Sequence, residues 1–572
     1  MAHPSLQPLT SPALLHLKEQ LRAEPRNEGL KTKIREMDRE LRDDYFRRLG
    51  QRRFAAWLLC GGGLLLILAG RQTLRLGWNP PTPSGRRAGW EELREMAERA
   101  RWATAGITGC VLLGLGAVAV TTRTSLPREG DALAKVLKKL DPEAQLAADP
   151  PPGLEEMKSN WPRFLGATGN ALANSSSNTP TPPTAWPTNW NPASGEGIAW
   201  KTPLKSKDFN SPIVWSNRVF IAEANEQERR VLGFDTANGS LVWEQSLKNV
   251  PGSPAQPPKV PEQTGFAAST MATDGRRVYA WFANGDLGAF SLDGKLSWSR
   301  NLGVPKNPYG HATSLAVWQG RIVTQLDQEE NAAGGSRLSL LAGATGKTIW
   351  EKSRHMPASW ATPIVVEVKG APQILTLGVP WLTAYALADG AEIWKAECLA
   401  GEITPSPIAV RDTVIAVSPS DKVSAFRLDG HGDVTKSHEA WNSSESAPDI
   451  TSPASDGERV FLLSTPGVLT CLDAAKGTKL WEQDLGFECN ATPVVAGGNI
   501  YIFGKKGEGA VVAATSTYQL IARADLGEPV LASPAAVRSH IYVRTAATLF
   551  CLGAPQSSGS HTEHRQLGEA RP

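Results

Sequence analysis

Nine polar or aromatic residues stand shortly before a recurring Ser or Thr, in segments that a repeat architecture would bring together. Tyr309, His311 and Trp360 are the most suggestive, because an imidazole can act as a base or a ligand and an indole can serve as a stacking platform. Convergent groups of this kind suit a small-ligand or peptide site, but they could equally fill and hydrogen-bond a channel mouth. The nine candidates are Asn210, Phe266, Tyr309, His311, Trp360, Thr404, Asp449, Glu488 and Asn490.

Familiar catalytic and metal motifs are missing from the sequence. It contains no GxSxG, HExxH, Walker-type or EF-hand pattern. Segment 429–433 (DGHGD) lacks the ligand spacing of a calcium site, so we expect a polar turn there. The six cysteines form no CxxC, CxxCH or adjacent pair, which excludes the usual zinc, haem-attachment and thioredoxin-like motifs. We therefore expect no catalytic residue, metal or cofactor.

The charge distribution argues against a nucleic-acid partner. The 572 residues carry a net charge of +3, but residues 1–150 hold 24 Lys and Arg against 17 Asp and Glu, and the rest hold 36 against 40. A nucleic-acid footprint needs a clustered basic face. The acidic-leaning main body does not offer one, while its 41% hydrophobic composition is enough for a large core.

Two uncharged apolar stretches, 54–70 and 103–120, predict transmembrane helices at the short end of the usual span. The alternative is a pair of buried helices. An amphipathic helical region (1–53) precedes them, a helical loop (71–102) separates them, and a helical and Pro/Ser-rich linker (121–197) follows. The chain is thus expected to be anchored in a membrane. The Lys and Arg counts around the two spans give conflicting orientations, so the side holding the main body stays open.

The elements that must position the nine candidates belong to a repeat in residues 198–553. A Gly-x-x-x-Trp turn recurs five times, twice in the fuller form Asp-x-x-x-Gly-x-x-x-Trp, at Asp235 to Trp243 and Asp473 to Trp481. Each tryptophan is predicted to wedge against the adjoining unit. The expected structural tryptophans, including two without the full turn, are Trp200, Trp243, Trp298, Trp350, Trp394, Trp441 and Trp481.

A second marker, a Ser or Thr opening an apolar strand, defines the number of units. It occurs eight times, at Ser211, Ser269, Thr313, Thr362, Ser406, Ser452, Thr492 and Ser533. Four short strands per unit at this spacing predict an all-β, eight-bladed β-propeller with four-stranded antiparallel blades. The last unit lacks a fourth strand and the isolated segment at Ile198 lacks the first three, so both ends should close the eighth blade. Residues 554–572 are expected to be a disordered tail.

The repeated Trp and Ser/Thr-Pro signatures, together with Trp161-Pro-Arg-Phe-Leu-Gly166, resemble the pyrroloquinoline-quinone-like (PQQ-like) β-propeller family over residues 160–553. That family includes quinoprotein dehydrogenases, with calcium and quinone on the propeller axis, and BamB-like propellers that scaffold outer-membrane protein assembly. This chain lacks the adjacent-cysteine pair and haem motif of the enzymatic branch.

The resemblance therefore implies a non-catalytic, BamB-like module with a protein partner, at a bacterial-type inner membrane and with a periplasmic propeller. The alternative is a PQQ- and Ca²⁺-dependent membrane dehydrogenase of alcohols or sugars.

Overall fold

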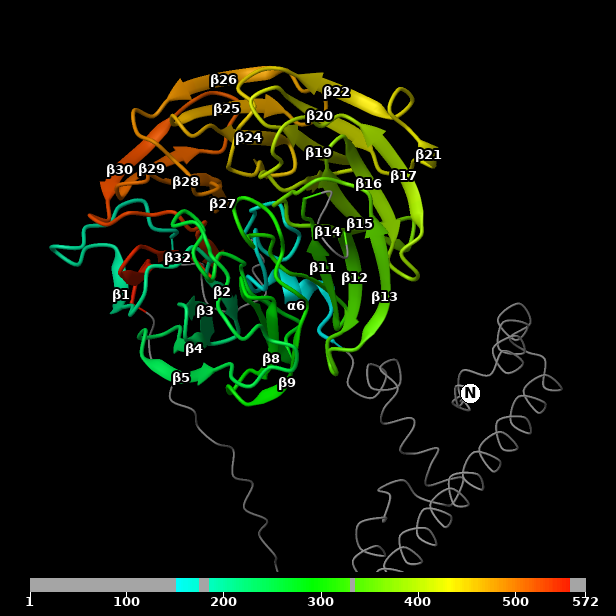
Figure 1. Cartoon of the computed structure of the whole chain (residues 1–572). Helices are drawn as coiled ribbons and strands as arrows, with labels where there is room; N and C mark the ends of the chain where they lie inside the picture. Colours follow the sequence, from blue (N-terminus) through cyan, green and yellow to red (C-terminus); the bar gives the residue numbers. More distant parts are fainter. Residues whose placement is uncertain (1–150, 174–184, 330–334, 556–572) are drawn as a thin grey trace, which may run out of the picture. The chain divides into compact units, whose positions relative to one another are not determined.

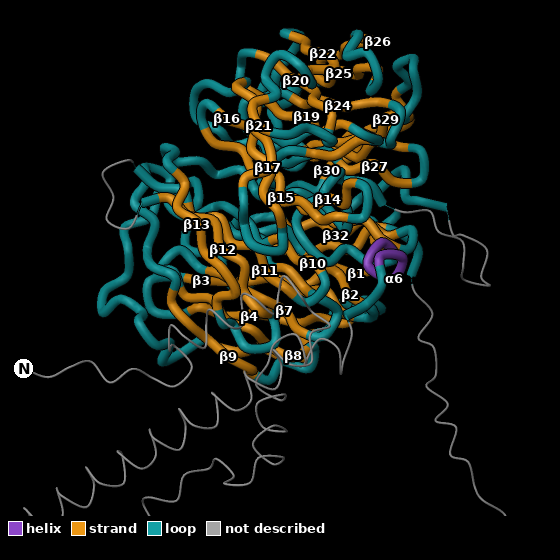
Figure 2. Tube along the Cα trace, turned by 90° about the vertical axis from the view of Figure 1, so that its right-hand side faces the viewer, coloured by secondary structure: helices purple, strands orange, loops and turns teal. Residues whose placement is uncertain are grey.

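The computed structural model describes residues 151–173, 185–329 and 335–555, all within the second of two compact units, Ser125–Pro572. The predicted membrane spans, the amphipathic N-terminal region and the tail beyond residue 555 lie outside these residues. Within the described part of the chain, no helix has both the length and the apolar character needed to cross a bilayer. Strands and loops dominate the described residues, which include one short helix, α6 (Leu154–Lys158) (Figure 2).

Eight antiparallel sheets surround a common axis, which confirms the predicted eight-bladed propeller (Figure 1). Blade 1 comprises β2 (Ile213–Trp215), β3 (Arg218–Ala224), β4 (Arg229–Asp235) and β5 (Leu241–Ser246). Blade 2 comprises β6 (Ala272–Thr273), β7 (Arg277–Trp281), β8 (Asp286–Ser291) and β9 (Leu296–Asn301). Blade 3 comprises β10 (Ala316–Trp318), β11 (Arg321–Leu326), β12 (Ser336–Ala342) and β13 (Thr348–Arg354).

The next blade is the one departure from four strands. Blade 4 comprises β14 (Ile364–Val368), β15 (Ala371–Gly378), β16 (Trp381–Ala386) and β17 (Glu392–Glu397). A fifth strand, β21 (Gly432–Asp433), pairs in parallel with the outer edge of β17. It comes from the loop between the third and fourth strands of blade 5, the segment expected to be only a polar turn.

The remaining blades complete the ring. Blade 5 comprises β18 (Ile408–Val410), β19 (Thr413–Ser418), β20 (Lys422–Arg427) and β22 (Glu439–Ser443). Blade 6 comprises β23 (Ala454–Ser455), β24 (Arg459–Leu463), β25 (Val468–Asp473) and β26 (Lys479–Asp484). Blade 7 comprises β27 (Val494–Ala496), β28 (Asn499–Phe503), β29 (Glu508–Ala513) and β30 (Leu520–Asp525). Blade 8 comprises β31 (Ala535–Val537), β32 (His540–Arg544), β33 (Thr548–Leu552) and β1 (Ile198–Pro203).

Both ends of the repeat therefore build the closing blade, as predicted. Strand β1 is the outer strand of blade 8 and pairs antiparallel with β33, with Lys201 opposite Phe550. The inner strands β2 and β31 touch, so the ring closes at the axis as well. Closure leaves no blade face exposed at the ends of the array, which an open stack of sheets would do.

Tryptophan docking holds neighbouring blades together. In each of the eight blades a β-bulge interrupts the pairing of the third and outer strands, and in seven of them a tryptophan sits at that point. The Trp200 indole N–H donates to the carbonyl oxygen of Thr236 in blade 1 at 2.7 Å. Its ring also covers Gly239, where an added Cβ would lie 2.4 Å from the indole. Gly239 has φ +71°, so the turn needs glycine for both conformation and contact.

The same bond to the next blade recurs for Trp243, Trp298, Trp350, Trp441 and Trp481. Trp394 differs, because its N–H donates to Gln373 within its own blade and its side chain is fully buried.

Blade 7 carries Ala522 where the other outer strands carry tryptophan. Trp190, which precedes β1, packs on this blade instead: its ring lies 5.4 Å from that of Phe503 and meets the position of a Cβ on Gly509. Segment 185–197, expected to be linker, thus contributes to the core.

Candidate functional site

A ring of eight side-chain hydroxyls surrounds the propeller axis at the start of the inner strands. Around this hydroxyl ring, the backbone N–H of one member donates to the side-chain oxygen of the member in the next blade. Seven such bonds of 2.9–3.0 Å link the eight blades. The members are Ser211, Thr270, Ser314, Thr362, Ser406, Ser452, Thr492 and Ser533.

Two of the eight predicted markers were wrong by one residue. The ring uses Thr270 and Ser314, whereas the strand pattern pointed to Ser269 and Thr313. Hydroxyl residues stand side by side in both blades, and no proline follows to mark the register as it does in the other six. The Ser269 hydroxyl is buried without a hydrogen-bond partner among the described residues.

The hydroxyl ring lines a cavity of about 200 Å³ on the axis. Aromatic, aliphatic and neutral polar side chains complete its wall, and none of the described residues that line it carries a charge. Beyond the ring, the lining comprises Phe164, Phe209, Gln263, Thr264, Ala268, Ala312, Trp360, Thr404, Ile450, Asn490 and Leu531.

Residues 161–173, here called the axial segment, cross the channel and place Phe164 in the cavity wall. Backbone hydrogen bonds tie this segment to inner strands or their flanks in blades 1, 2, 6 and 7, including the antiparallel bridge between Trp161 and Val214. The Asn170 side chain adds blade 5, donating to the Ala409 carbonyl at 2.6 Å and accepting from its N–H at 3.2 Å. The segment therefore obstructs the channel on one side of the hydroxyl ring.

Three of the nine predicted site residues, Trp360, Thr404 and Asn490, line this cavity. Trp360 is held in place because its indole N–H donates to the Gly310 carbonyl at 3.1 Å. The side-chain oxygen of Asn490 is buried without a hydrogen-bond partner in the described structure. Tyr309 stands beside them, its ring edge-on to Trp360 at 5.0 Å and 41% exposed.

His311 is buried away from the cavity lining and packs on Trp281, with 3.9 Å between ring centroids. Burial lowers the pKa of His311 to about 3, because desolvation disfavours the imidazolium. A neutral, enclosed imidazole packed on an indole serves the core, so the prediction of a base or ligand at this position has no support from the geometry.

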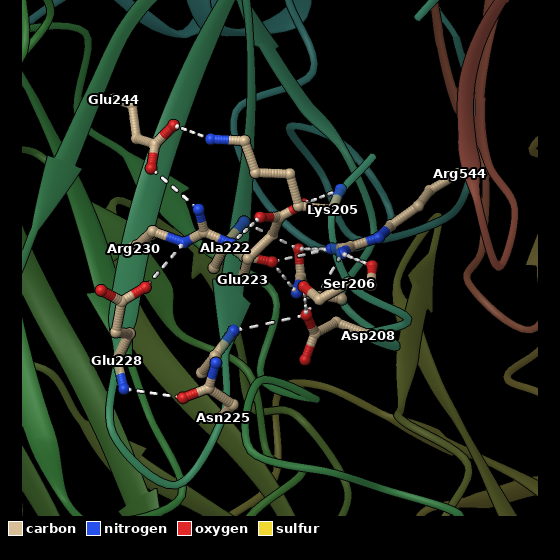
Figure 3. A network of polar contacts seen from close by, with 12 residues as sticks. Lys205, Ser206, Asp208, Ala222, Glu223, Asn225, Glu228, Arg230, Glu244 and Arg544 are labelled. Atoms are coloured by element: carbon tan, nitrogen blue, oxygen red, sulfur yellow. Dashed lines mark hydrogen bonds and ion pairs between the residues drawn. The ribbon is translucent and has the colours of Figure 1, made fainter. Parts of the chain in front are cut away.

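Asn210 belongs to a structural network at the seam between blades 8 and 1, and Figure 3 shows its partners Arg544 and Ala222 together with Asp208. Its side-chain oxygen accepts from Arg544 Nη1 at 2.8 Å and from the Ala222 N–H at 3.0 Å. Arg544 also lies 3.5 Å from Asp208, and all these side chains are buried. The network crosses the ring closure, where buried polar groups must be paired.

The last three predicted residues also make local contacts. Asp449 accepts hydrogen bonds from the backbone and hydroxyl of Thr465, and Glu488 forms an exposed ion pair with Lys505 at 2.9 Å. Phe266 packs against the apolar core of blades 1 and 2.

Sequence reasoning missed Phe164, Phe209 and Gln263 as cavity residues. Phe209 directly precedes predicted Asn210, so the correct loop was found but not which of its side chains turns inward. Among the described residues no group of three or more His, Cys, Asp or Glu could hold a metal ion.

Comparison with known proteins identifies the family. A family profile described as "Outer membrane protein assembly factor BamB" matches residues 188–330 and 334–554. No curated protein sequence matches the chain at a significant level.

Similar solved structures include quinohemoprotein alcohol dehydrogenase from Comamonas testosteroni, at 12% identity and TM-score 0.52, covering 70% of this chain and 81% of that one. Quinohemoprotein alcohol dehydrogenase ADHIIG from Pseudomonas putida HK5 is 12% identical, with TM-score 0.50 and coverage of 73% and 82%. BamB from Moraxella catarrhalis is 16% identical, with TM-score 0.47 and coverage of 61% and 95%. The two dehydrogenase structures show a shared fold alone at these identities, and the profile match over most of the chain shows that it belongs to the PQQ-like β-propeller family.

Proposed function

We propose that this chain is a membrane-anchored protein-binding module that scaffolds protein assembly in the cell envelope, and that extended segments of its partners bind along the outer strands of the blades. The observation that carries the proposal is a set of exposed apolar side chains near the start of five outer strands. We call this set the outer belt: Leu241, Val242, Leu296, Ile349, Leu480, Leu520 and Ile521, each 36–45% exposed.

The members of the outer belt lie one or two residues before the tryptophan at the β-bulge of their strand, or before Ala522 in blade 7. Because the blades are arranged around the axis, these residues lie at a similar height around the rim. Large apolar side chains exposed at repeated positions are typical of interaction surfaces. Each of these strands also ends its sheet, leaving one edge without a strand partner in the described structure. Free backbone groups beside apolar side chains are the two features that β-strand addition uses.

Blade 4 supports the idea that such an edge accepts a strand. There β21 pairs with β17, and the Val434 N–H donates to the Lys395 carbonyl at 2.8 Å. In this covered blade Trp394 is 0% exposed. The chain thus covers one of its own edges in the way proposed for a partner.

The axial cavity does not suit the alternative, a quinone-dependent dehydrogenase. Calcium takes six to eight oxygen ligands, with carboxylates prominent among them, and an anionic quinone needs cationic partners. The described residues lining the cavity include neither. Its volume of about 200 Å³ is also below the roughly 300–1,000 Å³ of most ligand sites.

Peptide binding tests the proposal directly. The probe is a fluorescent ten-residue peptide of alternating apolar and polar residues, titrated with purified full-length protein and followed by anisotropy. We expect saturable binding that Ile349→Glu and Ile521→Glu each weaken at least about tenfold, since a charge facing the peptide must be desolvated. A peptide N-methylated at alternate residues, which cannot pair at an edge, should not bind.

The matched control is Ile393→Glu on β17, whose edge β21 already covers, and it should leave the affinity unchanged. Equal loss in all three variants, or equal binding of the N-methylated peptide, would refute edge binding. Saturable PQQ binding with calcium, accompanied by dye-linked oxidation of an alcohol or sugar, would refute the scaffold function and support the dehydrogenase.

The proposed anchor and location have their own test. Full-length protein should sediment with membranes and resist carbonate extraction, whereas a variant lacking residues 1–150 should not. Protease added to intact spheroplasts should digest a periplasmic propeller, and protection from digestion would place it on the cytoplasmic side.

A further inference from the structure

Arg163 is a buried cation in the axial segment, and it has no counter-charge among the residues that the structure describes. Its residue exposure is 3%, and its one recorded hydrogen bond runs from Nη2 to the Ala167 carbonyl at 3.3 Å. Its Nη1 is buried with no partner in the described structure. A guanidinium carries five N–H donors and no acceptor, so this contact set leaves it largely unsatisfied.

The other strongly buried arginines all face carboxylates. Arg354 lies 3.4 Å from Asp327, and Arg544 lies 3.5 Å from Asp208. For Arg163 no ion pair occurs among the described residues, and segment 174–184, which follows the axial segment, contains no Asp or Glu. Burying a charge without a partner costs several kcal/mol, so the contrast needs an explanation.

Neutralisation of Arg163 does not resolve the problem. Burial lowers the pKa of Arg163 to about 10, which leaves the guanidinium protonated at neutral pH. Its surroundings are fitted closely: a Cβ on Gly169 would lie 3.0 Å from Nη1 and Nη2 and 2.9 Å from the Ile364 side chain. Gly169 has φ +78°, so its lack of a side chain allows the guanidinium to approach the backbone.

We propose that the axial segment holds a small monovalent inorganic anion, of chloride size, against Nη1 of Arg163. The buried, unpartnered Nη1 supplies the donor, and the close packing of Gly169 and Ile364 around the guanidinium favours a small ion over a larger oxyanion. Phe164, the next residue, lies in the cavity wall together with the hydroxyl ring, so the ion would sit near the axis, where the axial segment joins the blades. This inference is independent of the peptide-binding proposal.

Two measurements on the full-length protein test the anion. Crystals grown in bromide should give an anomalous peak within hydrogen-bonding distance of Arg163 Nη1. The Tm should also be higher in sodium chloride than in sodium methanesulfonate at equal ionic strength, a comparison that holds screening constant. Linkage predicts a rise of about 1 °C or more per tenfold increase in chloride above its Kd.

Arg163→Met should abolish the chloride dependence of the Tm. The matched control is Arg229→Met: Arg229 lies 3.2 Å from Asp286, so its loss should lower the Tm but leave the chloride dependence intact. If Arg163→Met does not fold, the bromide experiment on the unmodified protein still shows whether an anion binds at Arg163. A water molecule or a carboxylate side chain at Nη1, or a Tm that is equal in both salts, would overturn the proposal.

Discussion

Replacing Trp200 with alanine tests whether docking, in addition to strand pairing, closes the ring. Trp200 lies on β1, is 7% exposed, and donates to the Thr236 carbonyl of blade 1 at 2.7 Å. Removing a buried tryptophan side chain costs about 3–5 kcal/mol, of which a hydrogen bond accounts for roughly 1 kcal/mol. Set against a typical total stability of about 5–15 kcal/mol, this is a large loss at one seam.

Urea unfolding followed by circular dichroism measures the loss, and hydrogen exchange locates it. We expect Trp200→Ala to lower the free energy of unfolding by about 3–5 kcal/mol and to raise exchange selectively in β1, β33 and the β4–β5 hairpin that the indole contacts. The control is Trp481→Ala, whose N–H donates across the seam between blades 6 and 7 and whose side chain is more exposed. It should cost less and raise exchange at that seam. A cost below about 1 kcal/mol for Trp200→Ala, or the same exchange pattern in both variants, would refute docking as a closure device.

Three further changes address the hydroxyl ring and two buried titratable groups. Thr270→Val should destabilise the protein by about 1–3 kcal/mol in urea unfolding because the Ser211 N–H loses its acceptor. Ser269→Ala should leave the stability nearly unchanged. A larger loss for Ser269→Ala than for Thr270→Val would show that Ser269, the residue predicted from the sequence, is the ring member. His311 has a folded pKa of about 3 against about 6.5 unfolded, so the unfolded state binds more protons and stability falls as pH drops below about 6.5. His311→Phe should therefore reduce the fall in urea midpoint between pH 6.5 and 4, and an unchanged slope would contradict a buried neutral imidazole. Burial raises the folded pKa of Asp327 to about 6 despite Arg354, so the native state binds the extra proton and this group's contribution falls as pH rises from about 4 to 6. Asp327→Asn should remove this loss of stability, so the urea midpoint should rise more steeply with pH between about 4 and 6. An unchanged dependence of the midpoint on pH would contradict the raised pKa of Asp327.

The architecture could be predicted because its signals are local and repeated. Glycine turns followed by tryptophan, as at Gly239 to Trp243, recur at blade spacing, and their chemistry requires a neighbouring sheet to cover the indole. The unpaired strand at Ile198 likewise pointed to β33 as its partner. The fifth strand of blade 4 had no such signal, since two residues, Gly432 and Asp433, pair with an edge from another blade.

The candidate site was only partly predictable, because side-chain direction in a loop depends on the whole ring. Trp360, Thr404 and Asn490 line the cavity, whereas His311 from a similar loop turns into the core beside Trp281. Ser269 and Thr270 are adjacent residues that both carry a hydroxyl, so the sequence does not show which of them joins the hydroxyl ring. Only the bond from the Ser211 N–H distinguishes them.

The sequence alone determined the repeat, the number of blades and the shared closing blade, because each follows from patterns within about 50 residues or from the incomplete units at the ends. Tertiary structure decided what lies at the axis: Phe164 enters the cavity wall from a segment that precedes the repeat, and the hydroxyls gather from eight blades. No local pattern encodes such contacts, since they exist only once the ring has closed and brought distant residues to a common centre.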